Sequence, residues 1–310
     1  MDLVLILLLA LLSDLTVGEY PVGLHPTVWA GRVTGFLIKP GFRWPAGFQF
    51  VYGLFISLAI IALFTLPAWL LLDWLKGINY WLYIVTGAVL LKPTFCLKQQ
   101  WQVAEKTQAV LEKGAQVPLG MKGLFDTISH SDAVTRNDII SSSVRSIAEN
   151  ASDFVTAPLF FYIFLGVPGA IAYRVINTLD NMIGYRGKYE YLGKFAAVLD
   201  DLASFVPARI TGLFIVIAAR LRGFGFGQAW RTMLSDHDKT PGPNGGWPMA
   251  AAAGALGVKL YKAGHYEIGQ STRDLTPGNI SEAAGLFRVS MTVWIITAAS
   301  TLTLVSLMRG

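Results

Sequence analysis

Carboxylate and amide side chains flank a long apolar segment in the middle of the chain. Glu149, Asn150 and Asp153 precede the segment, and Asn177 and Asp180 follow it. An ionisable group held near hydrocarbon raises the free energy of a membrane protein unless it has a partner or a task. These residues therefore indicate a functional site, in which Glu149, Asp153 and Asp180 are candidate ligands for Mg²⁺, a cation that prefers oxygen donors.

The residues before the apolar segment allow a second interpretation. Arg145, Glu149 and Asp153 recur at every fourth position of a helix expected over 138–153. An exposed ladder of ion pairs has the same spacing, and each pair would add only a few tenths of a kcal/mol to stability. The row of Arg145, Glu149 and Asp153 ends where an apolar segment begins, and Asn150 flanks it. We therefore favour a functional site over an exposed ladder of ion pairs.

A second acidic pair follows later in the chain. Asp200 and Asp201 precede Pro207 and Arg209, an order that could form the wall of a site or, alternatively, an ordinary Asp–Arg pair at a helix end. Cations suit phosphate esters. The remaining candidates for substrate binding are His25, Arg186, Lys188, Arg209 and Asn244.

Composition indicates which elements must position these residues. The chain has 310 residues, of which 53% are hydrophobic and 15% charged, and its mean hydropathy is +0.49. Charged residues make up roughly 25% of a soluble domain, so the chain reads as an all-α polytopic integral membrane protein. Its net charge of +5 fits basic cytoplasmic loops, and no nucleic acid is expected as a partner.

Apolar runs predict about five to six membrane segments. The run Leu3–Leu12 is short for a span, which needs about 20 residues, and predicts a short or partly re-entrant first helix that continues past Asp14. The other expected elements are a loop over Gly18–Pro45, a span over Phe48–Leu72, a turn over Asp73–Asn79, a span over Tyr80–Leu97, a surface helix over Lys98–Gln116, a loop over Gly223–Gly246, a small-residue helix over Met249–Val258 and a last span over Gly285–Met308.

The apolar segment 156–179 contains a cluster of helix breakers. Gly166-Val167-Pro168-Gly169 interrupts it. One continuous helix would place Asp153 and Asp180 on opposite sides of the bilayer, whereas a re-entrant hairpin would place both on the same side. We favour the hairpin, because broken helices occur where the backbone lines a polar cavity or is buried in protein.

Basic residues predict the orientation. They are concentrated in the long loops, and the turn between the two clear spans holds only Lys76. The positive-inside rule places these large loops, and with them the candidate site, in the cytoplasm. No internal repeat or low-complexity linker is evident, so the sequence predicts one domain over 1–310. No nucleotide-binding, zinc or serine-hydrolase motif is present. The residues alone leave an enzyme and a transporter open.

The ordered motifs resemble a known family. The chain is similar to the adenosylcobinamide-phosphate synthase family of cobalamin biosynthesis, also called CobD or CbiB, over nearly its whole length. The motifs that carry the resemblance are Asp14, Gly18, His25-Pro26 and Gly31; Ala148-Glu149-Asn150 with Asp153; Ala157-Pro158-Leu159-Phe160-Phe161; Asn177-Thr178-Leu179-Asp180; Asp200-Asp201; Pro207-Ala208-Arg209; and Pro243-Asn244.

The resemblance implies an acid–amine ligase in the cell membrane. Such an enzyme joins a propionate of adenosylcobyric acid, a corrinoid, to the amine of aminopropanol phosphate or ethanolamine phosphate, and ATP and Mg²⁺ are the expected energy source and cofactor. Other late enzymes of the pathway are expected partners beside the lipid bilayer. Carboxylates would hold Mg²⁺ or accept the ammonium proton, cations would hold phosphate, and the amides of Asn150, Asn177 and Asn244 would bind the corrinoid.

Three positions depart from the family pattern. Glu19 replaces a usual aspartate, Ser131 replaces an arginine, and Arg145 stands where a glutamate is usual. These changes affect the expected phosphate-binding residues and leave the central carboxylates in place. A non-catalytic corrinoid-binding scaffold or a transporter is the alternative function.

Overall fold

The computed structural model describes residues 1–114 and 135–309. Contacts divide the chain into two compact units. Unit 1 comprises Met1–Cys96, Ala157–Ser204 and Thr297–Gly310, and unit 2 comprises Leu97–Thr156 and Phe205–Ile296. The two units are described separately, and the single domain expected from the sequence stays a prediction.

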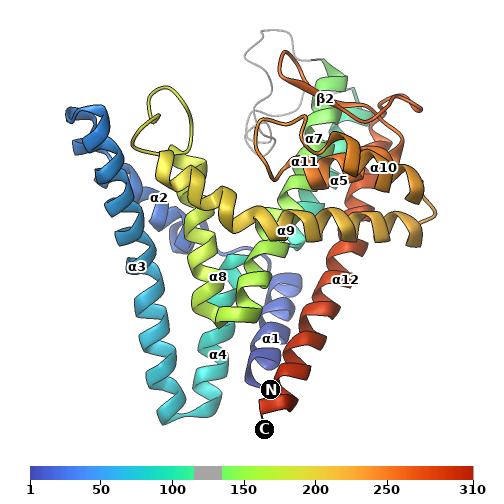
Figure 1. Cartoon of the computed structure of the whole chain (residues 1–310). Coiled ribbons are helices and arrows are strands. Elements are labelled where there is room, and N and C mark those ends of the chain that lie inside the picture. Colours follow the sequence, from blue (N-terminus) through green and yellow to red (C-terminus); the bar gives the residue numbers. More distant parts are fainter. Residues whose placement is uncertain (115–134, 310) are drawn as a thin grey trace. The chain divides into compact units, whose positions relative to one another are not determined.

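Unit 1 consists of helices. It contains α1 (Asp2–Thr16), a 3-10 turn (Val22–Leu24), α2 (Pro26–Leu37), a second 3-10 turn (Lys39–Arg43), α3 (Ala46–Ile78), α4 (Tyr80–Leu91), a third 3-10 turn (Lys92–Thr94), α8 (Ala157–Ile183) and parts of α9 (Lys194–Leu221) and α12 (Gly278–Arg309). In Figure 1, α3 and α4 run antiparallel and meet at a short turn. Asn79 forms that turn and caps α4, because its side chain accepts a hydrogen bond from the backbone N–H of Leu82.

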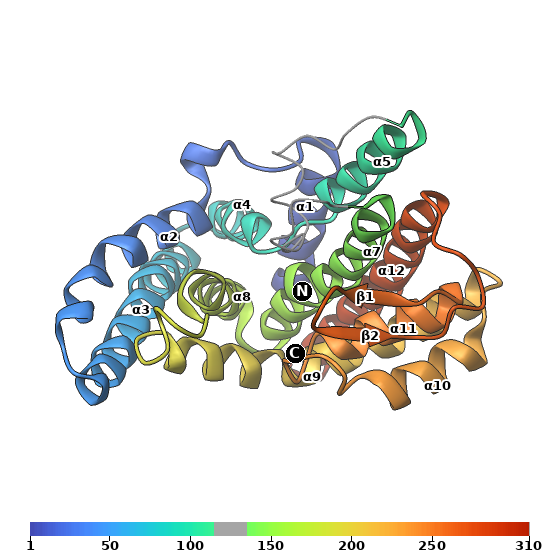
Figure 2. The same ribbon diagram turned by 90° about the horizontal axis from the view of Figure 1, so that it is seen from above.

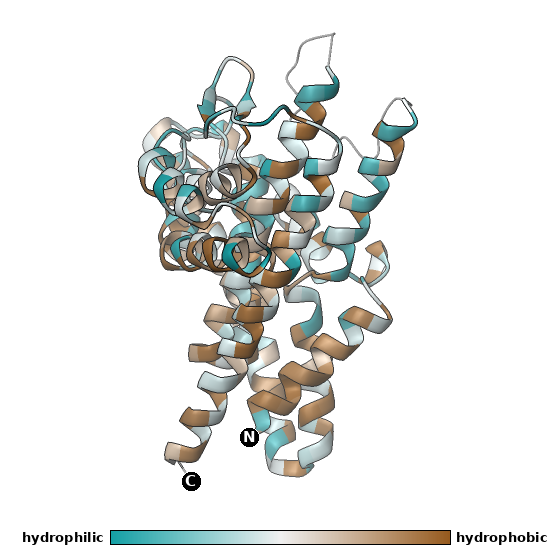
Figure 3. Cartoon of the chain, turned by 90° about the vertical axis from the view of Figure 1, so that its right-hand side faces the viewer, coloured by the Kyte–Doolittle hydropathy of each residue, from teal (hydrophilic) through white to brown (hydrophobic). Residues whose placement is uncertain are grey.

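Within the described residues, five helical segments are long and apolar enough to cross a membrane. They are Ala46–Ile78, Tyr80–Glu112, Arg136–Ile183, Lys194–Leu221 and Gly278–Met308. Large apolar side chains on α3 point outward, such as Leu70 at 58% and Trp74 at 63% exposure. Such a surface is unfavourable in water and normal in lipid. Near the C-terminus, α12 shows brown hydrophobic residues among pale ones in Figure 3. The all-α integral membrane fold expected from the sequence is confirmed.

The helix α8 is a hairpin of two arms joined at Gly166. That glycine has φ 66° and ψ −157°, a conformation that only glycine adopts readily. The rings of Phe161 and Tyr173 stack at 5.4 Å between centroids, whereas in one straight helix they would be about 18 Å apart. A Cβ atom on Gly169 would lie 2.7 Å from the carbonyl oxygen of Phe161. The predicted hairpin is therefore confirmed, and Figure 1 shows its two arms.

The second arm of α8 packs into the core of unit 1. Val175, Leu179 and Ile183 on this arm form one buried cluster with Ile56 and Ile60 of α3. The cluster fixes the rotation of the arm about its axis. Asn177 and Asp180 therefore lie on other faces of the helix than Leu179. Seen from above, α8 lies beside α3 (Figure 2).

Unit 2 combines helices with a short β-hairpin. It contains α5 (Lys98–Glu112), α7 (Arg136–Ala151), a π-helical turn (Ser152–Thr156), α10 (Phe226–Asp236), α11 (Gly246–Leu256), strands β1 (Leu260–Lys262) and β2 (Tyr266–Ile268), and the remaining parts of α9 and α12. β1 and β2 pair antiparallel, with Leu260 opposite Ile268. Figure 2 shows the strand pair over α11. Ser141 of α7 holds β1, because its hydroxyl accepts from the N–H of Tyr261 at 2.8 Å and donates to its carbonyl at 2.9 Å.

Several predicted elements differ from the structure. The expected loop Gly18–Pro45 contains α2, and the expected loop Gly223–Gly246 contains α10. The expected turn Asp73–Asn79 is wrong, since α3 continues to Ile78. The predicted span Tyr80–Leu97 ends as a regular helix at Leu91, because Pro93 cannot supply a helical backbone hydrogen bond.

Candidate functional site

Three carboxylates gather in unit 1 at the end of α8 and the start of α9. Asp180 ends the second arm of the α8 hairpin, and Asp200 and Asp201 lie in the first turns of α9. The charges of Asp180 and Asp201 act on the carboxyl group of Asp200, and the charge of Asp201 acts on that of Asp180. Such a group is stabilised by a bound cation, an ammonium group or a shared proton.

Hydrogen bonds hold Asp200 in place. Asn177 donates from Nδ2 to one carboxylate oxygen at 3.4 Å, and Ser204 donates to the other at 3.5 Å. The hydroxyl of Ser204 in turn contacts that of Tyr173 at 3.0 Å. Arg174 donates from Nη1 to the amide oxygen of Asn177 at 3.1 Å. Residues of α8 thus orient the carboxylate of α9.

The carboxylate of Asp180 occupies space that is open because Gly184, one helical turn later, has no side chain. A Cβ atom on Gly184 would overlap the Oδ1 atom of Asp180. The N–H of Gly184 donates to the carbonyl of Asp180 at 2.7 Å. The glycine therefore leaves the space that this carboxylate occupies.

The residues of α7 belong to unit 2. Arg145 is buried, and its Nη1 donates to the hydroxyl of Tyr266 at 2.8 Å. Asn150 donates to Gln100 of α5 at 3.2 Å. A Cβ atom on Gly245 would lie 2.7 Å from Oε1 of Glu149, so this carboxylate lies against the turn that begins α11. An exposed ladder of ion pairs is excluded, because Arg145 is 5% exposed.

Asp153 lies in the π-helical turn that follows α7. A π-helical turn widens the helix by one residue, and such turns are frequent at functional sites. The Asp153 side chain is half-buried.

Arg209 forms a second cluster of unit 2 with aromatic rings. Its guanidinium group lies 3.4 Å from the ring centre of Phe205 and 4.7 Å from that of Trp247. Nη1 donates to the amide oxygen of Asn244 at 3.4 Å. His237 stacks on Trp247 at 4.0 Å. Arg209 and Asn244, both predicted from the sequence, are thus in contact, and the cation lies close to two aromatic rings.

Lys188 and Arg186 lie in the loop between α8 and α9. Both are exposed. The Nζ atom of Lys188 lies 5.3 Å from the ring centre of Phe42 and 5.4 Å from that of Tyr189. These two cations belong to unit 1, as do Asp180 and Asp200.

His25 belongs to a buried charge network rather than to the acidic group. Its Nδ1 accepts from the backbone N–H of Thr27 at 3.3 Å, which caps α2. Its Nε2 lies 3.2 Å from Glu19. Glu19 pairs at 2.7 Å with Lys92, which also pairs at 3.0 Å with Asp14. Lys92 and Asp14 are fully buried.

Glu19 keeps its charge through this network. Burial by itself raises the pKa of Glu19, but hydrogen bonds from His25 and Lys92 and the charge of Lys92 outweigh it and lower the pKa to about 2. The network joins the loop after α1, the start of α2 and the end of α4.

Comparisons with known proteins identify the family. A family model described as CobD/Cbib protein matches residues 7–298. The chain belongs to the CobD/CbiB family of cobalamin biosynthesis proteins. A relative from Dehalococcoides mccartyi (strain CBDB1), named cobalamin biosynthesis protein CobD, is 42% identical over 298 residues, covering 96% of each chain.

More distant relatives carry related names. A probable cobalamin biosynthesis protein CobD from Methanothermobacter thermautotrophicus is 36% identical over 96% of this chain and 98% of the relative. One of the same name from Pyrococcus furiosus is 34% identical over 97% and 98%. No solved structure matches the chain. The family resemblance expected from the ordered motifs is confirmed.

Two of the departures from the CobD/CbiB pattern acquire a structural explanation. Glu19 forms the ion pair with buried Lys92, and Arg145 binds Tyr266 of β2. Ser131 lies outside the described residues. Glu19 and Arg145 therefore have contacts within their own units that do not involve the acidic group.

The acidic group fits Mg²⁺ in its donor chemistry. Within residues 1–114 and 135–309, no three His, Cys, Asp or Glu side chains are arranged as a complete metal site. Mg²⁺ usually binds through one or two carboxylates and completes its shell with water and substrate phosphate. Asp180 and Asp200 could supply such oxygen ligands in unit 1. Glu149 and Asp153 belong to unit 2, so the predicted set of Glu149, Asp153 and Asp180 remains a hypothesis.

Sequence reasoning missed several residues that position the candidate site in this CobD/CbiB-family chain. In unit 1 these are Tyr173, Arg174 and Ser204, and in unit 2 they are His237 and Trp247. Arg174 gave a signal, because a cation within an apolar segment is a candidate functional residue. Tyr173 and Ser204 gave none, because their polar groups meet only after the hairpin brings α8 beside α9.

Proposed function

We propose that this chain is an adenosylcobinamide-phosphate synthase, an acid–amine ligase of cobalamin biosynthesis. It would join a propionate carboxylate of adenosylcobyric acid to the amine of aminopropanol phosphate or ethanolamine phosphate, with ATP as the energy source. The observation that carries the proposal is the group of Asp180, Asp200 and Asp201 in a chain of the CobD/CbiB family. We further propose that the site faces the cytoplasm, which contains ATP.

The reaction requires activation of a carboxylate. Its oxygen attacks the γ-phosphorus of ATP, which gives an acyl phosphate and ADP. The amine then attacks the acyl carbon, phosphate leaves with the bonding electrons, and an amide remains. The attacking amine must lose protons, because an aminoalkyl phosphate enters as an ammonium ion.

The carboxylates of unit 1 could bind and deprotonate the amine of the aminoalkyl phosphate. Asp180, Asp200 and Asp201 would attract the ammonium group, and Asp200 would accept its proton. Asn177 and Ser204 hold Asp200 so that the carboxylate keeps its direction. Asn177 would therefore act by positioning Asp200 rather than by binding a corrin amide alone.

Cations suit the phosphate groups. Arg186 and Lys188 are exposed beside the acidic group along the chain, and Arg209 presents a flat guanidinium group that suits phosphate oxygens. Asn150 and Asn244 remain candidates for the corrinoid amides. Mg²⁺, when bound to carboxylates of unit 1 such as Asp180 and Asp200, would neutralise charge on the phosphates of ATP. Glu149 and Asp153 are candidate ligands within unit 2.

The proposal is tested with the purified full-length chain in lipid nanodiscs. The chain is incubated with adenosylcobyric acid, aminopropanol phosphate and Mg-ATP, and products are separated by liquid chromatography with mass detection. We expect adenosylcobinamide phosphate together with an equal amount of ADP. Corrinoid binding without amide formation under these conditions would overturn the ligase in favour of a scaffold. Ethanolamine phosphate in place of aminopropanol phosphate tests the choice of amine.

A further inference from the structure

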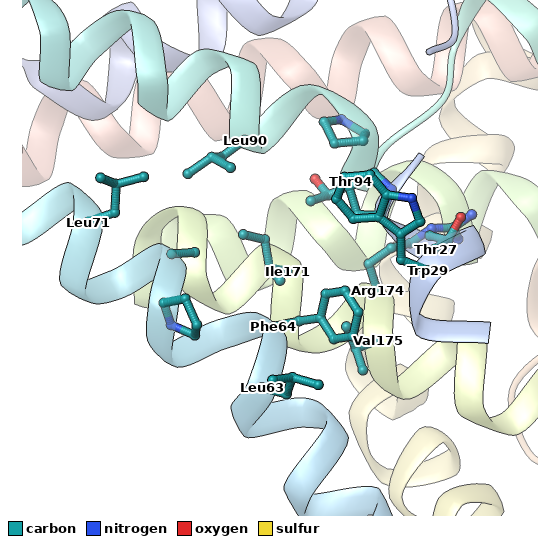
Figure 4. Close-up of a pocket in the computed structure, with 14 residues that line it drawn as sticks. Thr27, Trp29, Leu63, Phe64, Leu71, Leu90, Thr94, Ile171, Arg174 and Val175 are labelled. Carbon is teal, nitrogen blue, oxygen red and sulfur yellow. The ribbon is translucent and has the colours of Figure 1, made fainter. Parts of the chain in front are cut away.

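Unit 1 contains a cavity of about 290 Å³ that the candidate site does not use. The cavity lies among α2, α3, α4 and the second arm of α8. Its lining is almost entirely apolar and includes Leu63, Phe64, Leu71, Leu90 and Ile171. Figure 4 shows these side chains around the space.

The two ends of the cavity differ in polarity. Figure 4 shows Leu71 at one end, and Thr27, Trp29 and Arg174 together at the other. Among the described residues that line the cavity, Arg174 is the one charged side chain. Tryptophan and arginine beside one another are typical of the interface between lipid headgroups and hydrocarbon. The cavity therefore has an apolar body and a cationic end.

The substrates of the proposed reaction do not suit this cavity. An aminoalkyl phosphate has too little apolar surface to match the lining of this cavity. A corrin macrocycle with its side chains is too large for it, because a volume of about 290 Å³ is at the lower end of the range for ligand sites. A hydrocarbon chain with an anionic head matches both the lining and the charge. A phospholipid is the source of such a chain in a bilayer.

We propose that this cavity binds one acyl chain of an anionic phospholipid, with the headgroup phosphate at Arg174. The chain extends past Phe64 toward Leu71, and each methylene group that leaves water or disordered lipid adds contacts with the walls. This inference does not depend on the proposed function.

Lipid binding would influence the acidic group through the side chain of Arg174. Arg174 lines the cavity and also donates to Asn177, which holds Asp200. A phosphate at Arg174 would reduce the positive charge that Asn177 and Asp200 experience. The lipid is thus placed to influence the direction and charge of Asp200.

Native mass spectrometry of the full-length chain in detergent tests the proposal. Palmitoyl-oleoyl phosphatidylglycerol is the probe, and the diacylglycerol with the same chains, which has no phosphate, is the uncharged comparison. We expect the wild-type chain to retain one phosphatidylglycerol molecule with an apparent affinity about tenfold above that for the diacylglycerol, because the diacylglycerol has no phosphate to accept a charged hydrogen bond from Arg174. Equal affinities would overturn the role of Arg174.

A pair of tryptophan variants tests the location. Leu71→Trp should fill the apolar end of the cavity and weaken phosphatidylglycerol retention about tenfold. Leu70→Trp is the matched control, since Leu70 neighbours Leu71 on α3, is 58% exposed and does not line the cavity. Equal retention by the two variants would show that the lipid binds elsewhere and would overturn the proposal.

Variants of Arg174 test the headgroup. Arg174→Gln should abolish the preference for phosphatidylglycerol, and Arg174→Lys should keep part of it, because a point charge remains without the bidentate geometry. Circular dichroism of both variants shows whether the helices persist. Inorganic phosphate should not displace the lipid. Displacement by phosphate alone would assign Arg174 to a soluble anion and would overturn the lipid assignment.

Discussion

Asn177 of α8 donates a hydrogen bond to Asp200 of α9 at 3.4 Å, and its amide oxygen accepts one from Arg174 at 3.1 Å. One amide thus stands between a cation and a carboxylate. An amide at this place forms one hydrogen bond with each of the two charged groups. The α8 hairpin makes this arrangement possible, because it places the second arm beside the start of α9.

Replacing Asn177 by alanine should disturb Asp200. The carboxylate loses one of its two hydrogen bonds and Arg174 loses an acceptor, so we expect amide formation to fall about 100-fold, as misplacement of a reacting group by about 1 Å can do. The measurement is the initial rate of product formation at saturating substrates. Thr178→Val is the control, since the hydroxyl of Thr178 donates to the backbone carbonyl of Arg174. Equal rates for both variants would contradict the positioning role.

Replacing Asp180 by asparagine should abolish product formation. The two side chains have nearly the same shape, but the amide has no negative charge to attract an ammonium group or Mg²⁺. Corrinoid binding and circular dichroism should remain as in the wild-type chain. Asp73→Asn is a matched control, because Asp73 is exposed on α3. Normal turnover of the Asp180 variant would remove this residue from the site.

Replacing Gly184 by alanine should displace the carboxylate of Asp180. The added methyl group would overlap Oδ1, so the Asp180 side chain must leave its present position. We expect product formation to fall by at least about tenfold, with a smaller loss of thermal stability. Gly77→Ala is the control, since no atom lies within 4 Å of a Cβ at that position. Unchanged activity of the Gly184 variant would mean that the position of Asp180 does not matter.

The ion pair of Glu19 and Lys92 should make stability depend on pH in acid. The pKa of Glu19 is lowered from 4.5 to about 2 in the folded chain. The charged form therefore stabilises the fold fully above about pH 4.5, and this contribution is lost as the pH falls toward 2. This shift in pKa corresponds to ~3 kcal/mol of folding free energy. The melting temperature of the wild-type chain in detergent should fall over this range.

Glu19→Gln is the variant that isolates this effect. It should lower the melting temperature at pH 6, because Lys92 loses a charged partner, and should show a weaker dependence on pH between 4.5 and 2.5. Glu190→Gln serves as the control, since Glu190 is exposed in the loop between α8 and α9. Parallel pH curves for the wild type and the Glu19 variant would exclude Glu19 as their source.

The membrane helices could be predicted because their signal is local. The span expected over Phe48–Leu72 lies within α3, and that over Gly285–Met308 lies within α12. The breaker Gly166-Val167-Pro168-Gly169 predicted the hairpin of α8 for the same reason. A glycine that can adopt a positive φ, followed by a proline, interrupts a helix whatever surrounds it.

The helices α2 and α10 were missed because they begin in segments rich in glycine and proline. Pro26 is the first residue of α2, a position at which proline is favourable, and the side chain of His25 caps the helix. Similarly, Thr135 caps α7 with a capping box to Asp138, whereas the sequence analysis placed the start of this helix at residue 138. Histidine is a rare cap, and its orientation here depends on Glu19.

By itself, the sequence determined the membrane class, the hairpin of α8, the family and the identity of the candidate carboxylates. Only the tertiary structure decided which polar groups meet. In the tertiary structure, Asn177 contacts Asp200, buried Lys92 forms ion pairs with Asp14 and Glu19, and Arg174 lies at the end of an apolar cavity. The physical reason is that apolar periodicity and helix breakers act between neighbours in sequence, whereas a buried charge finds its partner among residues far along the chain.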